Sequence, residues 1–198
     1  MDSILIKLDK SLFLYLNGIH SAFFDLIMYW ASNMLLWIPV YLFFLLIFQR
    51  TLISKSYPYI TSKNILIIGF ILVDILICVE LLPPIFSAFA SRIKPCYDPE
   101  ISSVIHTVGD QCVEKFGFFT YRSCTIFAIS TFLFFAFGNS FKWMKFCLIF
   151  LAILVSYSRI YLGAHYPLNV LASALLGITI GYLSYRLYFY IKNSVLII

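Results

Sequence analysis

Charged residues are scarce in this chain. Only 12% of its 198 residues are Asp, Glu, Lys or Arg, whereas 62% are hydrophobic and 19% are aromatic. Soluble domains carry about 25% charged residues, so the composition excludes a water-soluble enzyme or binding module. Apolar runs that reach or approach the roughly 20 residues needed to cross a bilayer are spread along the whole length. We therefore expect residues 1–198 to form a single integral membrane domain.

Metal-binding patterns are also absent from the sequence. It holds three histidines and five cysteines, but no CxxC pair and no His/Cys spacing of the kind that binds zinc, so we expect no metal and no cofactor. The net charge of +5 does not indicate nucleic acid, because the Lys and Arg residues lie in short loops between apolar segments. The first ten residues lack the order of charges and apolar residues typical of a cleaved signal peptide, so the N-terminus is expected to be retained.

The five cysteines divide by their surroundings. Cys78, Cys124 and Cys147 lie in apolar segments, where a thiol packs as a small hydrophobic group. Cys96 and Cys112 flank a polar loop. We expect a Cys96–Cys112 disulfide if that loop faces an oxidising compartment, and two free thiols if it does not.

The apolar segments predict an all-α bundle of five to six transmembrane helices. The expected spans cover approximately residues 34–48, 64–82, 117–137, 146–161 and 167–191. Residues 3–18 instead place apolar side chains at helical spacing, with Asp9 and other charged residues on or near the opposite face. This pattern is typical of a helix that lies in the membrane interface. Residues 1–33 are thus expected to form interfacial and angled helices, and a sixth span results only if this part also crosses the membrane.

Basic residues orient these spans. The connections at residues 50–63 and 142–145, and the C-terminal end from Arg186 onward, carry Lys and Arg, which places them on the cytoplasmic side. The loop at about 83–116 and the turn at 158–169 then lie together on the opposite side of the membrane. We expect this to be the outer, periplasmic face of a bacterial inner membrane.

One stretch at this outer face combines an arginine, a histidine and small polar residues. Residues 158–169 read S-R-I-Y-L-G-A-H-Y-P-L-N, a spacing of S-R-x5-H-x3-N. The guanidinium fork of Arg159 matches phosphate geometry, and His165 is a candidate nucleophile, base or hydrogen-bond donor. Pro167 suits the first turn of the next helix, whose N-terminal amides favour an anion. The alternative is that both side chains only face the lipid headgroups, which accounts for two such residues but not for the whole spacing.

The full spacing resembles the third signature of the type 2 phosphatidic acid phosphatase (PAP2) family, S-R-x5-H-x3-D, with an amide in place of the final carboxylate. The resemblance covers about residues 60–190 and implies a PAP2-like helix bundle. In that family the third-motif histidine is the phosphate-accepting nucleophile, the aspartate orients it, and the second-motif histidine is the general acid. The resemblance makes His165 the nucleophile candidate, Arg159 and Ser158 phosphate-binding residues, and Asn169 the residue at the aspartate position.

The two upstream PAP2 signatures are present only in outline. The first usually reads K-x6-R-P, and here Lys94 stands at the arginine position, Ser87 at the lysine position and Arg92 nearby. The second usually reads P-S-G-H before small residues and Phe-Ala. Residues 117–128 fit that frame, which puts Arg122 at the histidine position, and no other register supplies a histidine. The phosphate-binding residues implied by the resemblance are Arg92, Lys94, Arg122, Ser158 and Arg159.

These replacements predict retained binding and weakened chemistry. Arg122 does not donate a proton near neutral pH, since the pKa of a guanidinium exceeds about 12, and losing a general acid costs on the order of 10²–10⁴ in rate. Asn169 carries no charge to stabilise an imidazolium, and the comparable change in a Ser-His-Asp triad lowers kcat by about 10⁴. We expect a membrane protein that binds a lipid or polyprenyl phosphate at the outer leaflet, with weak or lost hydrolysis.

Two alternatives stay open. The chain is an active lipid phosphate or diphosphate phosphatase if His165 still acts as nucleophile and Arg122 or a water replaces the lost acid. It is a non-catalytic lipid-binding or transport subunit if it partners an active enzyme. Phosphate release that His165→Ala abolishes distinguishes the first alternative, and copurification of an enzyme distinguishes the second.

Overall fold

The computed structural model describes residues 2–43, 62–89, 92–109, 115–138 and 142–195. These residues form an all-α fold, in which the β pairing consists of one isolated bridge between Ile93 and Phe116. The elements in chain order are α1 (Asp2–Asn17), α2 (Ala22–Ala31), the 3-10 turn η1 (Met34–Leu36), α4 (Ser62–Leu76), the π-helix η2 (Ile77–Leu81), α5 (Leu82–Phe89), the 3-10 turn η3 (Pro95–Tyr97), α6 (Tyr121–Ala136), α7 (Lys142–Tyr161) and α8 (Pro167–Val195).

Three helical segments of the described chain are long and apolar enough to cross a membrane. They are Ile65–Ala88, Lys142–Tyr161 and Pro167–Ser194, and the first runs without a break through α4, η2 and α5. Each coincides with an expected span. A further apolar helix, α6, is shorter than the expected 117–137 span because residues 115–120 are not helical and the helix begins only at Tyr121. The expected span at 34–48 is helical from residue 34 to 43, and the rest of it lies outside the described residues.

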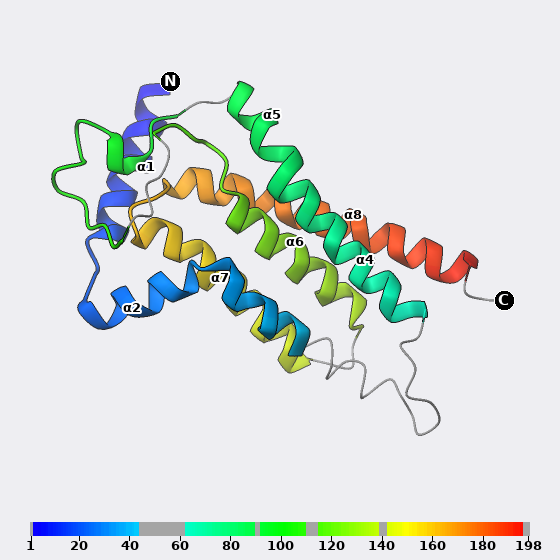
Figure 1. Ribbon diagram of the computed structural model, residues 1–198. Coiled ribbons are helices and arrows are strands. Elements are labelled where there is room, and N and C mark those ends of the chain that lie inside the picture. Colours follow the sequence, from blue (N-terminus) through cyan, green and yellow to red (C-terminus); the bar gives the residue numbers. More distant parts are fainter. Residues whose placement is uncertain (1, 44–61, 90–91, 110–114, 139–141, 196–198) are drawn as a thin grey trace.

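Helix α6 forms the centre of the bundle and packs most extensively on α8 (Figure 1). Two glycines of α8, Gly177 and Gly181, permit this contact. A Cβ at Gly177 would lie 2.3 Å from the carbonyl oxygen of Cys124, and one at Gly181 would lie 2.1 Å from that of Ala128. A four-residue spacing of small residues lets two membrane helices approach closely, so these glycines fix how α6 and α8 are placed.

Helix α1 lies across one end of the bundle, beside the loop that follows α5 (Figure 1). It presents a buried face made of Asp9, Phe13 and Asn17, which are 3%, 0% and 1% exposed and spaced four residues apart. Its apolar side chains Ile4, Leu5, Leu8 and Leu12 are exposed, which suits contact with lipid. A helix is therefore present where the interfacial helix was expected, and Asp9 lies on the face opposite Ile4, Leu5, Leu8 and Leu12, as expected. Phe13 differs from the expectation, because it lies on the buried face with Asp9. That this helix lies in the membrane interface stays a prediction.

The N-terminal helices do not form a straight span. Helices α1 and α2 would together be long and apolar enough to cross a membrane, but they are bent by 116° at the break between them. Asn17, at the end of α1, and Ser21, which caps α2 by accepting from the Phe24 N–H, mark this break. The bend sends α2 back along α7, on which it packs.

The cysteines follow their expected surroundings. Cys96 is disulfide-bonded, and Cys112, its expected partner, lies outside the described residues. Cys78, Cys124 and Cys147 are free thiols. Cys78 and Cys124 are fully buried, and their sulfur atoms lie 3.3 Å apart between η2 and α6.

Candidate functional site

The end of the bundle near α1 gathers positive side chains around His165. Arg159 comes from the last turn of α7, Arg122 from the first turn of α6, and Lys94 from the loop before η3. All three lower the pKa of His165 through their charge, after burial, which has the largest effect. The folded protein therefore keeps this imidazole neutral, surrounded by cations that come from three separate segments.

Two of these cations share one oxygen. Nη1 of Arg159 and Nη1 of Arg122 both donate to Oγ of Ser32, the latter at 3.4 Å. Ser32 follows α2 and is 2% exposed, and Arg159 is 3% exposed. The hydroxyl thus holds two guanidinium groups at the same buried point, close enough to repel each other.

His165 lies on a tight turn between α7 and α8. The N–H groups of Ala164 and His165 both donate to the carbonyl oxygen of Arg159, at 3.0 and 3.1 Å. Gly163 has φ +74°, and a Cβ there would lie 2.9 Å from Thr107 and 3.1 Å from the His106 carbonyl oxygen, so the turn requires glycine. Nδ1 of His165 is buried and has no hydrogen-bond partner among the described residues.

The residues described so far, Ser32, Lys94, Arg122, Arg159 and His165, are called the cluster below. Asn169 and Arg92 form a separate group beside it. Oδ1 of Asn169 accepts from Nη1 of Arg92 at 3.3 Å, and Nδ2 of Asn169 donates to the Gly117 carbonyl oxygen at 3.4 Å. Arg92 also pairs with Asp9 and lies over the Tyr166 ring, 3.8 Å from its centroid. Neither amide contact of Asn169 reaches His165, so the residue at the expected aspartate position serves Arg92 instead.

The remaining expected residues differ in their burial and in their contacts. Lys94 is buried and packs on Gly117, where a Cβ would lie 3.0 Å from Lys94 Cε. Ser158 is fully buried, and its hydroxyl donates to the Val155 carbonyl oxygen of its own helix at 2.6 Å. Ser87 is exposed on α5, and its hydroxyl donates to the Pro84 carbonyl oxygen of the same helix at 2.9 Å.

A backbone pairing joins the two upstream motif regions. The Lys94 N–H donates to the Lys115 carbonyl oxygen at 3.0 Å, and the Gly117 N–H donates to that of Arg92 at 2.8 Å. This short antiparallel contact places the loop that carries Lys94 directly beside the approach to α6. The structure therefore brings together the chain regions of all three expected motifs, although their side chains differ from the expected pattern.

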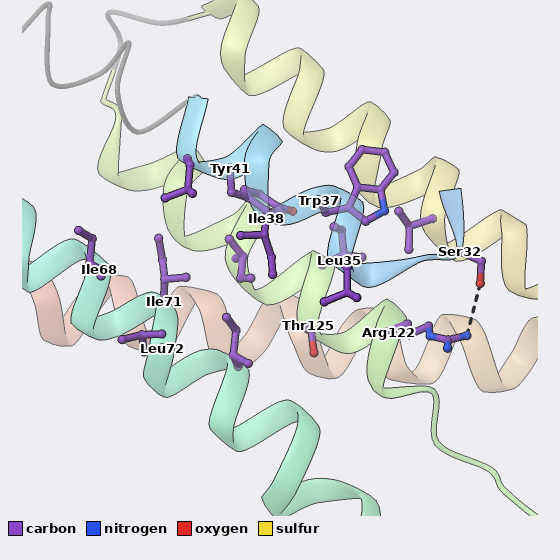
Figure 2. Close-up of a pocket in the computed structure, with 15 residues that line it drawn as sticks. Ser32, Leu35, Trp37, Ile38, Tyr41, Ile68, Ile71, Leu72, Arg122 and Thr125 are labelled. Atoms are coloured by element: carbon purple, nitrogen blue, oxygen red, sulfur yellow. Dashed lines mark hydrogen bonds between the residues drawn. The ribbon is translucent and has the colours of Figure 1, made fainter. Parts of the chain in front are cut away.

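A mostly apolar cavity of about 420 Å³ extends from this cluster into the bundle (Figure 2). Arg122, Ser32 and Thr125 form its polar end, as the close-up shows. Its other walls come from the segment after η1, from α4, and from α6 and α7. The apolar residues that line it are Leu35, Trp37, Ile38, Tyr41, Leu42, Ile68, Ile71, Leu72, Ile75, Ile126, Ile129 and Val155.

A family model described as the PAP2 superfamily matches residues 64–193 of the chain. The chain belongs to this superfamily. Its lineage is therefore that of membrane-bound phosphoric ester hydrolases. The match covers α4 through α8 and includes every residue of the cluster except Ser32.

Two relatives are similar over most of the chain, and a third is similar over a short stretch of it. Lipid A 4'-phosphatase of Porphyromonas gingivalis is 27% identical over 193 residues, which are 96% of this chain and 76% of the relative. The lipid A 4'-phosphatase of Bacteroides thetaiotaomicron is 28% identical over 188 residues, 93% of this chain and 79% of the relative. Undecaprenyl-diphosphatase of Sulfolobus acidocaldarius is 52% identical over 46 residues, 23% of this chain and 22% of the relative.

A solved structure has the same fold. The crystal structure of Aquifex aeolicus LpxE superposes with a TM-score of 0.61 at 23% sequence identity, and the overlap covers 90% of this chain and 95% of that one. The overlap thus extends beyond the PAP2-matched region into the N-terminal helices. The all-α PAP2 arrangement expected from the sequence is confirmed.

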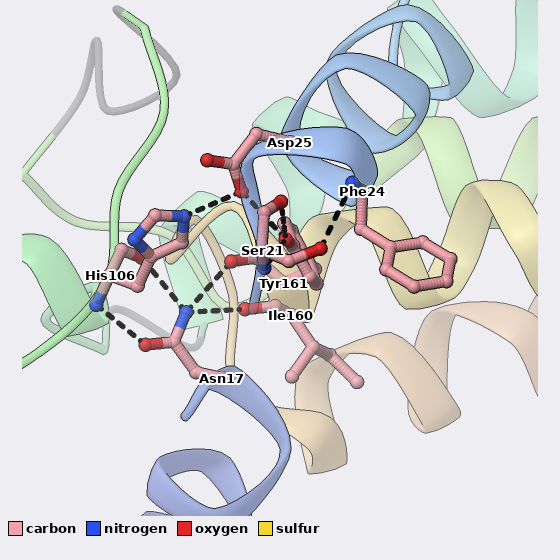
Figure 3. A network of polar contacts seen from close by, with 7 residues as sticks. All are labelled: Asn17, Ser21, Phe24, Asp25, His106, Ile160 and Tyr161. Carbon is pink, nitrogen blue, oxygen red and sulfur yellow. Dashed lines mark hydrogen bonds and ion pairs between the residues drawn. The ribbon is translucent and has the colours of Figure 1, made fainter. Parts of the chain in front are cut away.

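The segment before the PAP2-matched region supports the cluster in a way that sequence reasoning missed. Nδ2 of Asn17 donates to the carbonyl oxygens of Ile160, Tyr161 and His106, at 3.3, 2.8 and 2.9 Å, and so satisfies the last turn of α7 (Figure 3). Asp25 accepts from the Tyr161 hydroxyl at 2.6 Å and pairs with Nε2 of His106 at 2.8 Å. The hydrogen bond from Tyr161 lowers the pKa of Asp25.

This network fixes the turn of α7 that carries Arg159. The signal that could have found it is the helical spacing of polar residues opposite the apolar face of residues 3–18. Asp9 and Asn17 lie eight residues apart, on the same face of one helix. In lipid-facing helices such polar positions point toward protein partners.

Proposed function

We propose that this PAP2 protein binds a lipid phosphate at the outer leaflet of the membrane and hydrolyses it slowly or not at all. The observation that carries the proposal is the convergence of Arg159, Arg122 and Lys94 on a neutral His165. A phosphate group accepts hydrogen bonds from such cations in charge-assisted form, and guanidinium groups match its geometry. The arrangement is one that an anion would stabilise by relieving the repulsion between the cations.

The adjoining cavity supports a ligand with an apolar tail. It begins at Arg122 and Ser32 and continues between α4, α6 and the segment after η1, along almost wholly apolar walls. A lipid whose phosphate lies at the arginines would have its hydrocarbon chain at the mouth of this cavity. Phosphorylated glycolipids and polyprenyl phosphates both have this chemistry, and relatives named for each class are similar to the chain.

The geometry around His165 supports weak catalysis. A histidine nucleophile needs a partner that fixes its tautomer and stabilises the charged form. Nδ1 of His165 has none among the described residues, while Asn169 is bound to Arg92. A guanidinium such as that of Arg122, at the general-acid position, is a far weaker proton donor than the imidazolium that a histidine would supply there. The phosphate-binding role expected of Arg92 stays a prediction, because its Nη1 contacts Asp9 and Asn169.

A binding measurement combined with a turnover measurement tests the proposal. Purified full-length protein in lipid nanodiscs would be titrated with undecaprenyl phosphate and with a 4'-phosphorylated lipid A, each beside the same lipid without its phosphate. We expect binding that requires the phosphate and no phosphate release above that of the His165→Ala variant. Equal affinity for the phosphorylated and unphosphorylated lipids would reject the proposed site.

The active-phosphatase alternative has one specific observation in its favour. His165 and Arg159 both occupy their family positions, and the turn between them is closed by hydrogen bonds to the Arg159 carbonyl oxygen. Phosphate release by the wild-type protein that His165→Ala abolishes would establish this alternative and reject the loss of hydrolysis. The same binding data would then define its substrate.

A further inference from the structure

Asp9 brings a carboxylate from α1 to the point where α8 begins. Its Oδ1 accepts a hydrogen bond from the Leu168 N–H at 2.9 Å, and its Oδ2 forms a 2.5 Å ion pair with Nη1 of Arg92. Asp9 is 3% exposed, and a carboxylate buried to this degree is costly unless it is paired and hydrogen-bonded. Both of its oxygens meet that condition.

The same nitrogen of Arg92 also binds Asn169. Nη1 donates to Oδ1 of Asn169 at 3.3 Å, so one nitrogen joins the α1 carboxylate to the amide at the family's aspartate position. A carboxylate at position 169 would have an oxygen where the amide oxygen now lies. Asp9 and an aspartate at 169 are therefore alternative counter-charges for a single arginine.

The N-terminus of α8 gives a second reason for a carboxylate here. Helix α8 begins at Pro167, which has no N–H, so the Leu168 N–H is the first amide of the helix. The positive end of a helix dipole favours a negative group close to such amides. An N-cap residue supplies such a group from the position directly before the helix, whereas Asp9 supplies it from α1.

We propose that Asp9 is a positioning residue that supplies, from outside the PAP2-matched region, the negative charge that position 169 lacks in this chain. It neutralises Arg92, keeps that guanidinium over the Tyr166 ring and holds the Asn169 amide turned toward Arg92. The alternative is that Asp9 only attaches α1 to the bundle. This inference goes beyond the proposed function, because it requires neither ligand binding nor turnover.

Thermal unfolding of the full-length protein in one detergent at pH 7 separates the two roles. We expect Asp9→Asn to lower Tm by roughly 10 °C, because it leaves Arg92 without its buried partner. Asn169→Asp added to Asp9→Asn should restore at least half of that loss. Glu100→Gln is the matched control: it removes an exposed carboxylate that pairs with the neighbouring Lys10, and should change Tm by less than about 2 °C.

The stability of the double variant shows whether Asp9 acts as the counter-charge of Arg92 or only attaches α1 to the bundle. If Asp9→Asn with Asn169→Asp is no more stable than Asp9→Asn alone, including the case in which neither folds, the shared-charge proposal is overturned and Asp9 only docks α1. Folding of the double variant where Asp9→Asn fails to fold supports the proposal. Asn169→Asp with Asp9 intact should not raise Tm, because Arg92 is already neutralised; a clear rise would contradict it.

Discussion

Arg122 and Arg159 donate to the same oxygen, Oγ of Ser32. Both guanidinium groups therefore converge on one point at the polar end of the apolar cavity, where their positive charges repel each other. An anion between them would gain from both charges at a point where Ser32 and Arg159 are buried. The hydroxyl oxygen marks where a phosphate oxygen would accept from both arginines, which makes this pair the first place to test.

Removing either arginine is expected to weaken binding of a lipid phosphate. Arg159→Gln should lower affinity on the order of 100-fold and Arg122→Gln on the order of 10-fold, because Arg159 is the more buried and losing a buried charged donor costs more. The measurement is the Kd for undecaprenyl phosphate in nanodiscs. Arg186→Gln, an exposed arginine on α8, is the control and should leave Kd unchanged. An unchanged Kd in Arg159→Gln would refute the assignment.

Restoring two family residues is expected to restore hydrolysis. Arg122→His returns a proton donor near neutral pH. Asn169→Asp returns a carboxylate that is free to turn from Arg92 toward His165, because Asp9 continues to neutralise Arg92. The double variant should release phosphate at least about 100-fold faster than the wild-type protein, and adding His165→Ala should remove this gain. A double variant that binds the lipid but stays inactive would indicate that the backbone of the site has also diverged.

Much of the fold was predictable because membrane helices follow directly from local sequence. Apolar runs gave the spans at 64–82, 146–161 and 167–191, since backbone groups inside a bilayer must be satisfied within each helix. The spacing S-R-x5-H-x3-N correctly placed Arg159 and His165 on either side of one turn. That part of the site is local: the Arg159 carbonyl oxygen accepts the two hydrogen bonds that close it.

The missed part of the site depends on contacts that are distant in the chain. Ser32 lies 127 residues from Arg159, and Asp9 lies 83 residues from Arg92. No periodic pattern determines which distant arginine a buried serine or aspartate will meet, because that depends on the bend between α1 and α2. The partners of Arg92 were missed for the same reason, because they come from α1 and α8. Its expected binding of phosphate stays a prediction.

The neutral state of His165 predicts how stability depends on pH. Burial, and then the charges of Arg159, Lys94 and Arg122, hold the pKa of His165 well below 6.5 in the folded protein. The unfolded chain binds a proton at His165 near pH 6.5 that the folded protein does not bind. The contribution of His165 to the free energy of unfolding is therefore complete above pH 6.5 and is lost as the pH falls below it. The expected slope is up to about 1.4 kcal/mol per pH unit.

Unfolding of the wild-type protein between pH 8 and pH 5 checks this slope. His165→Gln should reduce it, while His20→Gln, at an exposed position, should leave it in place. Saturating lipid phosphate should also reduce the slope, because an anion beside the imidazole favours its protonated form. An identical pH profile in His165→Gln would assign the acid sensitivity to other groups.

The close approach of α6 and α8 makes a last prediction about the fold that carries the site. Gly181→Ala should lower Tm by several degrees, because its Cβ would lie 2.1 Å from the Ala128 carbonyl oxygen and would push the two helices apart. Gly69→Ala in α4, where nothing lies within 4 Å of the new Cβ, should be neutral or slightly stabilising. Separation of α6 from α8 would also move Arg122 relative to Asn169, so Gly181→Ala should weaken lipid-phosphate binding more than Gly69→Ala does. Equal Tm values for the two variants would mean that these helices are not packed through their glycines.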